Sequence, residues 1–126
     1  MQKSLRAPLG PLDRIYVSSH QSIYADFVMQ IDHRVGRLNE LLDELGISKN
    51  TILIFTSDNG CSPQAKFDEL EKKGHDPSGL FRGHKADIFE GGHRVPFIVK
   101  WPKKIQAASI SHKTICTTDL LATCAD

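Results

Sequence analysis

Residues 51–60 have the sequence Thr51-Ile52-Leu53-Ile54-Phe55-Thr56-Ser57-Asp58-Asn59-Gly60. The apolar part is continuous rather than alternating, which is typical of a strand buried on both faces, as in the centre of a mainly parallel sheet. A polar cluster, Ser57 to Gly60, follows at once, at the carboxyl end of this predicted strand. Ligands of open α/β sheets collect at the carboxyl ends of the strands. The segment therefore predicts an α/β fold with a candidate site directly after the first strand.

A helix is predicted upstream, over residues 22–45. Apolar residues recur there in steps of three and four, which places them in one stripe on a helix. They are Ile23, Phe27, Ile31, Val35, Leu38, Leu41, Leu42 and Leu45. Ser22 can cap the start of this helix, and Gly46 can adopt the left-handed conformation that ends it. Residues 1–21 show no sustained period, and we interpret them as a loop or a disordered tail.

Downstream of the cluster, residues 61–84 form a long excursion with a charged helical piece at residues 66–73. A loop of this length is usually functional or flexible. A second strand is predicted at residues 95–101, where Pro96 suits the start of a strand or an edge. A further helix begins at Asp119. We expect the helix over residues 22–45 to pack on a sheet that contains both strands.

Composition excludes several classes of protein. The 126 residues contain 16 Lys and Arg against 15 Asp and Glu, a formal net charge of +1, so nothing favours nucleic acid or an anionic membrane as partner. The longest apolar run, Ile52 to Phe55, is far shorter than the roughly 20 residues of a transmembrane helix. Residues 1–10 lack the apolar region of a secretory signal. We therefore expect no membrane span, coiled coil, disulfide mini-protein or basic DNA-binding domain.

The three cysteines, Cys61, Cys116 and Cys124, show no spacing typical of a zinc site. Cys116 and Cys124 have apolar or small neighbours, which predicts buried free thiols.

The first candidate site is Asp58-Asn59. A carboxylate beside an amide oxygen offers hard oxygen donors, which suit calcium or magnesium rather than zinc. The alternative is an ordinary Asn-Gly turn in which Asp58 caps a neighbour.

Two further groups follow. Arg82-Gly83-His84-Lys85 can hold an oxyanion, because a lysine is a compact charge and a glycine permits close backbone approach; the alternative is a solvated basic loop. In Glu90-Gly91-Gly92-His93-Arg94 the paired glycines predict a sharp backbone reversal, and Glu90 with Arg94 predicts a local ion pair rather than a catalytic pair.

The order and spacing of three motifs resemble a known family. A helix that contains Tyr24 to Gly36 is followed by Asn50 to Gly60, and then by Phe81-Arg82-Gly83-His84-Lys85-Ala86-Asp87-Ile88-Phe89-Glu90-Gly91-Gly92-His93-Arg94-Val95-Pro96 with Trp101-Pro102. This run resembles the later part of the catalytic domain of type I, formylglycine-dependent sulfatases of the arylsulfatase kind. The resemblance covers roughly residues 22–126 and does not extend convincingly into residues 1–21.

The resemblance implies an alkaline-phosphatase-like fold and the hydrolysis of sulfate esters. It implies that Asp58 and Asn59 are ligands of a calcium ion and that Lys85 contacts the sulfate group as a catalytic and substrate-binding residue. Asn59 also distinguishes the chain from the dizinc phosphatases of the same superfamily, which typically have histidine at this position, because imidazole favours zinc.

The resemblance also implies residues that this chain does not supply. The family carries an early pair of aspartate ligands and a Cys or Ser that becomes formylglycine within a Cys/Ser-x-Pro-x-Arg motif. Cys61-Ser62-Pro63-Gln64-Ala65 is similar, but Ala65 stands where arginine is required, so Cys61 is not taken as the nucleophile. The family's upstream histidines cannot be assigned to His20. We therefore expect residues 22–126 to be a partial catalytic domain, truncated at both ends and inactive alone.

The implied partner is a sulfated small molecule or a sulfated glycan. His75 and His84 border the long loop and either contact substrate or have no role. Two alternatives remain: a formylglycine-dependent phosphonate monoester hydrolase or phosphodiesterase, and a non-catalytic sulfatase-like scaffold. The family resemblance suggests a periplasmic, secreted or lysosomal location.

Overall fold

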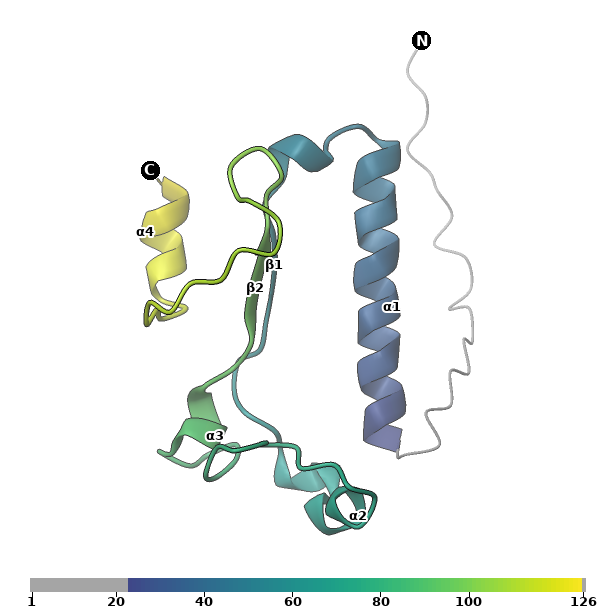
Figure 1. Ribbon diagram of the computed structural model, residues 1–126, viewed down its shortest axis with the longest axis vertical. Helices are drawn as coiled ribbons and strands as arrows, with labels where there is room; N and C mark the ends of the chain where they lie inside the picture. The colour runs from purple at the N-terminus through teal and green to yellow at the C-terminus, as the bar shows by residue number, and fades with distance from the viewer. Residues whose placement is uncertain (1–22, 126) are drawn as a thin grey trace.

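The computed structural model describes residues 23–125, so the predicted tail and the cap at Ser22 lie outside the described residues. Helices and a short sheet alternate along this part, which confirms the α/β class. The elements are α1 (Ile23–Glu44), a 3-10 turn (Ser48–Asn50), β1 (Leu53–Thr56), a second 3-10 turn (Pro63–Ala65), α2 (Phe67–Glu71), α3 (Glu90–His93), β2 (Phe97–Lys100) and α4 (Asp119–Ala125). Figure 1 shows the sheet between α1 and α4, with α2 and α3 grouped beyond the end of β1.

Helix α1 confirms the helix predicted from the apolar stripe. Gly46 ends it at a φ of 70°, as predicted. The Gly46 backbone N–H donates to the Asp43 carbonyl at 3.0 Å, and the Ile47 N–H donates to the Leu42 carbonyl at 3.1 Å. These two bonds form a Schellman motif, which satisfies carbonyl groups that the helix end would leave without partners.

Strands β1 and β2 pair antiparallel, with Leu53 opposite Lys100 and Thr56 opposite Phe97. Within residues 23–125, β2 is the one neighbour of β1, so this part of the chain contributes an antiparallel pair to the expected mainly parallel or mixed sheet. The prediction that residues 51–56 are buried on both faces is wrong, since the Phe55 side chain is 36% exposed. A single neighbouring strand leaves part of its surface open to solvent.

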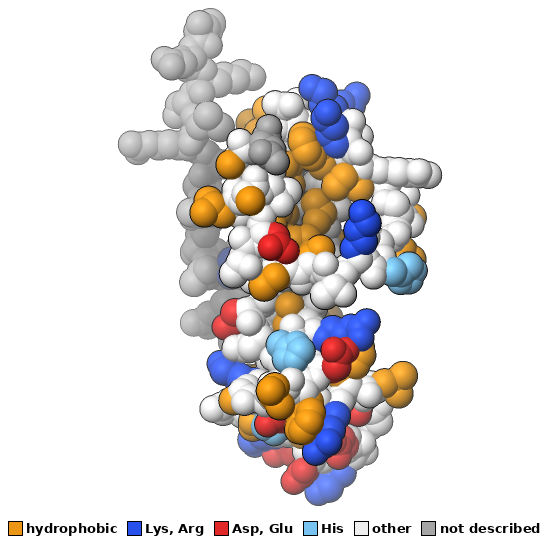
Figure 2. Space-filling view, turned by 90° about the vertical axis from the view of Figure 1, so that its left-hand side faces the viewer, with side chains coloured by type: hydrophobic (Ala, Val, Ile, Leu, Met, Phe, Trp, Pro, Cys, Tyr) orange, Lys and Arg blue, Asp and Glu red, His pale blue; other side chains and the backbone are white. Residues whose placement is uncertain are grey.

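The hydrophobic core of the described residues is small. The buried hydrophobic side chains are Ala65 and Leu70, both at α2 or the turn before it. Helix α1 lies beside the sheet (Figure 1) and is joined to it by the Lys100 ammonium, which donates to the Asn39 side-chain oxygen at 2.9 Å. No residue of α1 is fully buried, and Figure 2 shows hydrophobic side chains open on the face that carries α4. The sheet and its helices therefore enclose little apolar surface by themselves.

Two smaller expectations have definite outcomes. The prediction of buried thiols at Cys116 and Cys124 is wrong: both are exposed, because the segment before α4 and α4 itself lie on the surface. Across residues 23–125, no helix combines the length and the apolar character needed to cross a membrane.

Candidate functional site

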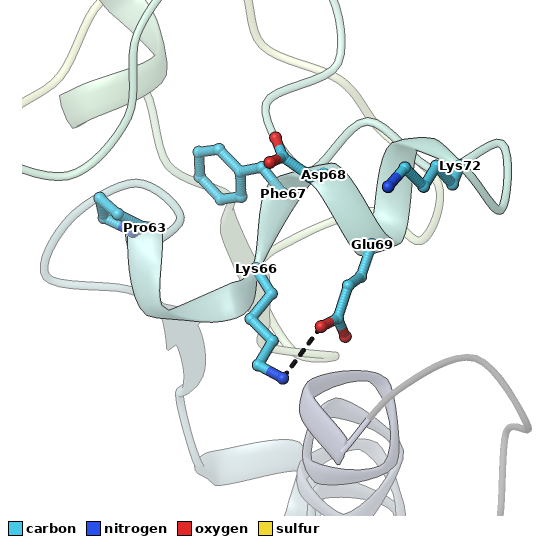
Figure 3. A pocket seen from close by; sticks show the side chains of 6 residues that line it. All are labelled: Pro63, Lys66, Phe67, Asp68, Glu69 and Lys72. Atoms are coloured by element: carbon cyan, nitrogen blue, oxygen red, sulfur yellow. Dashed lines mark hydrogen bonds and ion pairs between the residues drawn. The ribbon is translucent and has the colours of Figure 1, made fainter.

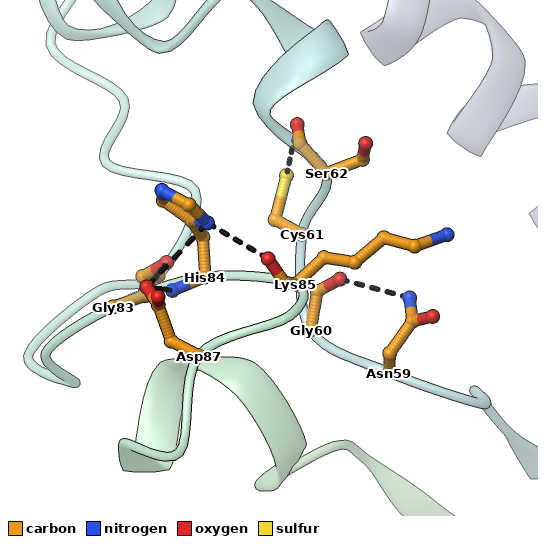
Figure 4. A network of polar contacts seen from close by, with 9 residues as sticks. Asn59, Gly60, Cys61, Ser62, Gly83, His84, Lys85 and Asp87 are labelled. Atoms are coloured by element: carbon orange, nitrogen blue, oxygen red, sulfur yellow. Dashed lines mark hydrogen bonds and ion pairs between the residues drawn. The ribbon is translucent and has the colours of Figure 1, made fainter.

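The polar cluster lies where the sequence predicts it, immediately after β1. The Ser57 hydroxyl donates to the Asn59 carbonyl at 2.9 Å, and the Asn59 side-chain nitrogen donates to the Gly60 carbonyl at 3.1 Å. Figure 4 shows the Asn59 nitrogen toward Gly60 and its amide oxygen pointing away. Asp58 is exposed and Asn59 is half-buried. The Asp58 carboxylate accepts one long hydrogen bond, from the Ser57 hydroxyl at 3.5 Å. The turn therefore exists, and it carries two side chains with oxygen atoms.

The loop that carries Lys85 returns to this cluster. The Lys85 backbone N–H donates to the Cys61 carbonyl at 2.9 Å, and the Gly60 N–H donates to the Gly92 carbonyl at 2.8 Å. The exposed Lys85 side chain extends along residues 59–61, on the side where the Asn59 side chain lies (Figure 4). The fold thus brings together the two groups that the sequence analysis selected, although a long excursion separates them in the chain.

A tight turn at residues 84–87 shapes the Lys85 loop. The Asp87 carboxylate accepts a bond from the His84 backbone N–H at 2.9 Å, and the Asp87 N–H donates to the His84 carbonyl at 2.9 Å. The His84 ring lies 2.9 Å from the Lys85 carbonyl through Nδ1 and makes an edge contact with Phe67 at 5.5 Å. Its imidazole is therefore occupied within the loop, whereas His75 lies just after α2 and bonds through its backbone to Leu70.

Two arginines stack on aromatic rings around the same loop. The Arg82 guanidinium lies 3.7 Å from the centre of the Phe89 ring, and that of Arg94 lies 4.8 Å from the Phe81 ring. Arg94 also pairs with Glu90, which confirms the predicted ion pair. Sequence reasoning missed both stacking contacts, because residues 81–89 form a loop, where no regular period relates position in the chain to contact.

Cys61 has the environment of a structural thiol. Burial raises the pKa of the Cys61 thiol, and its sulfur donates weakly to the Ser62 carbonyl at 3.9 Å. A raised pKa keeps the thiol protonated, whereas the reactive form is the thiolate. This environment agrees with the interpretation that Cys61 lines the loop.

Within the part of the chain that the structure describes, no group of three or more His, Cys, Asp or Glu residues could hold a metal ion. Asp58 and Asn59 supply two oxygen donors, fewer than calcium requires. A shallow depression beside α2 contains none of the predicted site residues (Figure 3). It is lined by Pro63, Lys66, Phe67, Asp68, Glu69 and Lys72, and the Lys66 ammonium pairs with Glu69 across it at 2.9 Å.

Comparison with known proteins identifies the class. The sulfatase family model matches residues 11–126, so this chain belongs to the sulfatase family. Its fold is correspondingly that of a partial alkaline-phosphatase-like domain. A solved structure from work on the metabolism of multiple glycosaminoglycans by Bacteroides thetaiotaomicron superposes with a TM-score of 0.66 at 37% identity. That match covers 83% of this chain and 22% of the solved one.

Particular relatives have different named activities. The chain is 39% identical over 110 residues to an N-acetylgalactosamine-6-O-sulfatase of Bacteroides thetaiotaomicron, covering 82% of this chain and 21% of that protein. It is 37% identical to the human steryl-sulfatase, covering 85% and 18%, and 38% identical to an arylsulfatase of Hemicentrotus pulcherrimus, covering 90% and 19%. The chain therefore spans about a fifth of the length of these relatives.

Proposed function

We propose that this chain forms part of a larger sulfatase domain that hydrolyses sulfate esters. In this proposal Asp58 and Asn59 bind a calcium ion, and Lys85 contacts the sulfate group. The supporting observation is the bond from the Lys85 N–H to the Cys61 carbonyl at 2.9 Å, because it holds the lysine loop beside the segment that carries both oxygen ligands.

The donor chemistry fits calcium. Calcium binds six to eight hard oxygen ligands, and the Asp58 carboxylate and the Asn59 amide oxygen are two of this kind. When bound, the ion would supply positive charge that favours an anionic sulfate ester. The remaining ligands and the formylglycine nucleophile would come from other parts of the domain.

Lys85 would act on the same anion. Its ammonium is a compact charge with three donors, and hydrolysis of a sulfate ester moves negative charge onto the departing oxygen as the S–O bond breaks. Gly83, two residues earlier, has a φ of 83°, which allows the tight path of the loop. The chain's contribution to the reaction is then to hold this charge in place before the substrate arrives.

The substrate would be a sulfated glycan or a sulfated small molecule. Two relatives are named for such substrates, one for sulfated N-acetylgalactosamine and one for sulfated steroids. The identity to both relatives, 39% and 37%, supports this class of substrate.

Calcium dependence tests the proposal directly. In the complete domain, Asp58→Ala should raise the calcium concentration needed for half-maximal hydrolysis of an aryl sulfate by at least about tenfold, since it removes a charged ligand. Asp32→Ala, an exposed aspartate on α1, is the matched control and should leave this concentration unchanged. Equal calcium dependence in both variants would reject Asp58 as a ligand. Hydrolysis of phosphonate monoesters but not sulfates, or of neither, would favour the phosphohydrolase or the scaffold.

A further inference from the structure

Four glycines meet where the Lys85 loop packs against the segment after β1. The buried Gly91 and Gly92 of α3 lie against Gly60 on one side and Gly83 on the other. A Cβ at Gly60 would lie 1.7 Å from the Gly91 carbonyl oxygen, and a Cβ at Gly91 would lie 2.1 Å from the Gly83 carbonyl oxygen. Backbone therefore touches backbone directly here, and we name Gly60, Gly83, Gly91 and Gly92 the glycine contact.

We propose that the glycine contact positions Lys85 relative to Asp58 and Asn59, and that Gly91 is a positioning residue whose effect passes through Lys85. This inference rests on the proposed function. It adds that the distance between the lysine and the oxygen ligands is set by the absence of side chains at these glycines.

The hydrogen bonds show how the contact couples the two segments. The Gly91 N–H donates to the Arg82 carbonyl at 2.8 Å, and the Gly60 N–H donates to the Gly92 carbonyl at 2.8 Å. Helix α3 is therefore bonded to two segments: Gly91 holds the start of the lysine loop, and Gly92 holds the segment after Asn59. A third bond, from the Lys85 N–H to the Cys61 carbonyl, joins the lysine loop directly to the segment after Asn59.

Few residues separate the glycine contact from Lys85. A Cβ at Gly91 meets the backbone of Arg82 and Gly83, and Gly83 is two residues before Lys85. A shift of the loop there reaches the lysine with little chain to absorb it. An alanine at Gly91 meets a backbone oxygen rather than a flexible side chain. Reaching ordinary contact requires a displacement of about 1 Å, and misplacement on this scale can cost on the order of 10²-fold in rate.

A double-mutant cycle in the complete sulfatase tests the inference. The variants are Lys85→Ala, Gly91→Ala and both together, assayed by kcat on an aryl sulfate per folded molecule and by the Kd of inorganic sulfate. Gly91→Ala should lower kcat about 10²-fold and weaken sulfate binding, because the ammonium is misplaced. In the Lys85→Ala background the same change should lower kcat less than about threefold, because groups that act as a unit are not additive.

Gly36→Ala is the matched control, since a Cβ at Gly36 meets nothing within 4 Å. It should leave kcat and the sulfate Kd unchanged. If Gly91→Ala does not fold, Gly83→Ala takes its place in the cycle. Its Cβ meets side-chain atoms of Asp87 and Phe89, and its φ of 83° strains an alanine, so it displaces the lysine loop from the other side of the contact.

The outcomes separate the two claims. A loss in Lys85→Ala without one in Gly91→Ala, or fully additive losses, overturns the positioning role alone. An unchanged kcat in Lys85→Ala overturns the proposed role of Lys85, and the positioning role with it.

Discussion

Lys85 is exposed, its backbone N–H is bonded to the Cys61 carbonyl, and its side chain lies along residues 59–61 (Figure 4). In the proposed function its ammonium is a charge held in place before the substrate arrives, and such a charge lowers the barrier without reorganising during the reaction. Lys85→Ala should therefore lower kcat by about 10²–10³, measured by steady-state kinetics on the complete enzyme and normalised to the folded fraction. Lys85→Arg should restore little, because a planar guanidinium does not occupy the position of a compact ammonium.

Lys49→Ala provides the control for charge alone, since Lys49 is an exposed lysine in the turn before β1. It should leave kcat unchanged. A loss of less than about threefold in Lys85→Ala, far below the scale of such contacts, would mean that Lys85 only shapes the loop.

The cysteines differ in reactivity in a way that pH can reveal. Hydrogen bonds from Thr118 lower the pKa of the exposed Cys116 thiol, whereas burial raises the pKa of Cys61. Because the thiolate is the nucleophile, iodoacetamide at pH 7.5 should label Cys116 before Cys61, as followed by peptide mass spectrometry. The difference between the two labelling rates should become smaller as the pH rises past the ordinary thiol pKa of 9.0, because Cys61 then ionises as well. Labelling in urea is the control, since unfolding should make the two rates similar. Faster labelling of Cys61 than of Cys116 in the folded protein would contradict the raised pKa of Cys61 and the lowered pKa of Cys116.

Helix α1 offers a matched pair of glycines, one at its end and one in its interior. Gly46 has a φ of 70°, where an alanine is strained, so Gly46→Ala should lower the free energy of unfolding by about 1 kcal/mol or more. Gly36 lies inside the helix with open space around it, so Gly36→Ala should raise it by about 0.5–1 kcal/mol. Urea denaturation followed by far-UV circular dichroism gives both values. The same sign for the two changes would refute the Schellman end of α1.

The antiparallel pairing of β1 with β2 shows the limit of pattern reasoning at the level of elements. A continuous apolar run identifies a strand, and residues 53–56 confirm it. The direction of its neighbour depends instead on the path of residues 57–96, which turn back through α3 and enter β2 from the site end of the sheet (Figure 1).

At the scale of the whole molecule, the described residues bury little apolar surface. Large apolar side chains remain open on several elements, among them Phe27 at 60% and Ile98 at 61% exposure. So many large apolar side chains exposed on separate elements support the proposal that the chain packs within a larger domain.

The isolated 126-residue chain should hydrolyse an aryl sulfate no faster than buffer, even with calcium in excess. In the proposed function it supplies two of the six to eight oxygen ligands that calcium takes, and its sequence contains no Cys/Ser-x-Pro-x-Arg motif. Release of the phenol measures the rate, and the complete domain is the positive control. Calcium-dependent hydrolysis by the isolated chain that disappears in Asp58→Ala would show that it is sufficient by itself.

The local features were predictable from the order of residues: the helix of α1 and its end at Gly46, strand β1, helix α4, the Glu90–Arg94 pair and the position of Asp58-Asn59 after β1. Each depends on residues within one or two turns or a few positions along a strand, where backbone geometry alone relates sequence to structure. The bond from the Lys85 N–H to the Cys61 carbonyl, and the glycine contact between the two segments, became visible in the folded chain. Those contacts join residues far apart in the chain. A sequence shows that a residue is glycine, but not that the backbone of another segment occupies the position where its Cβ would lie.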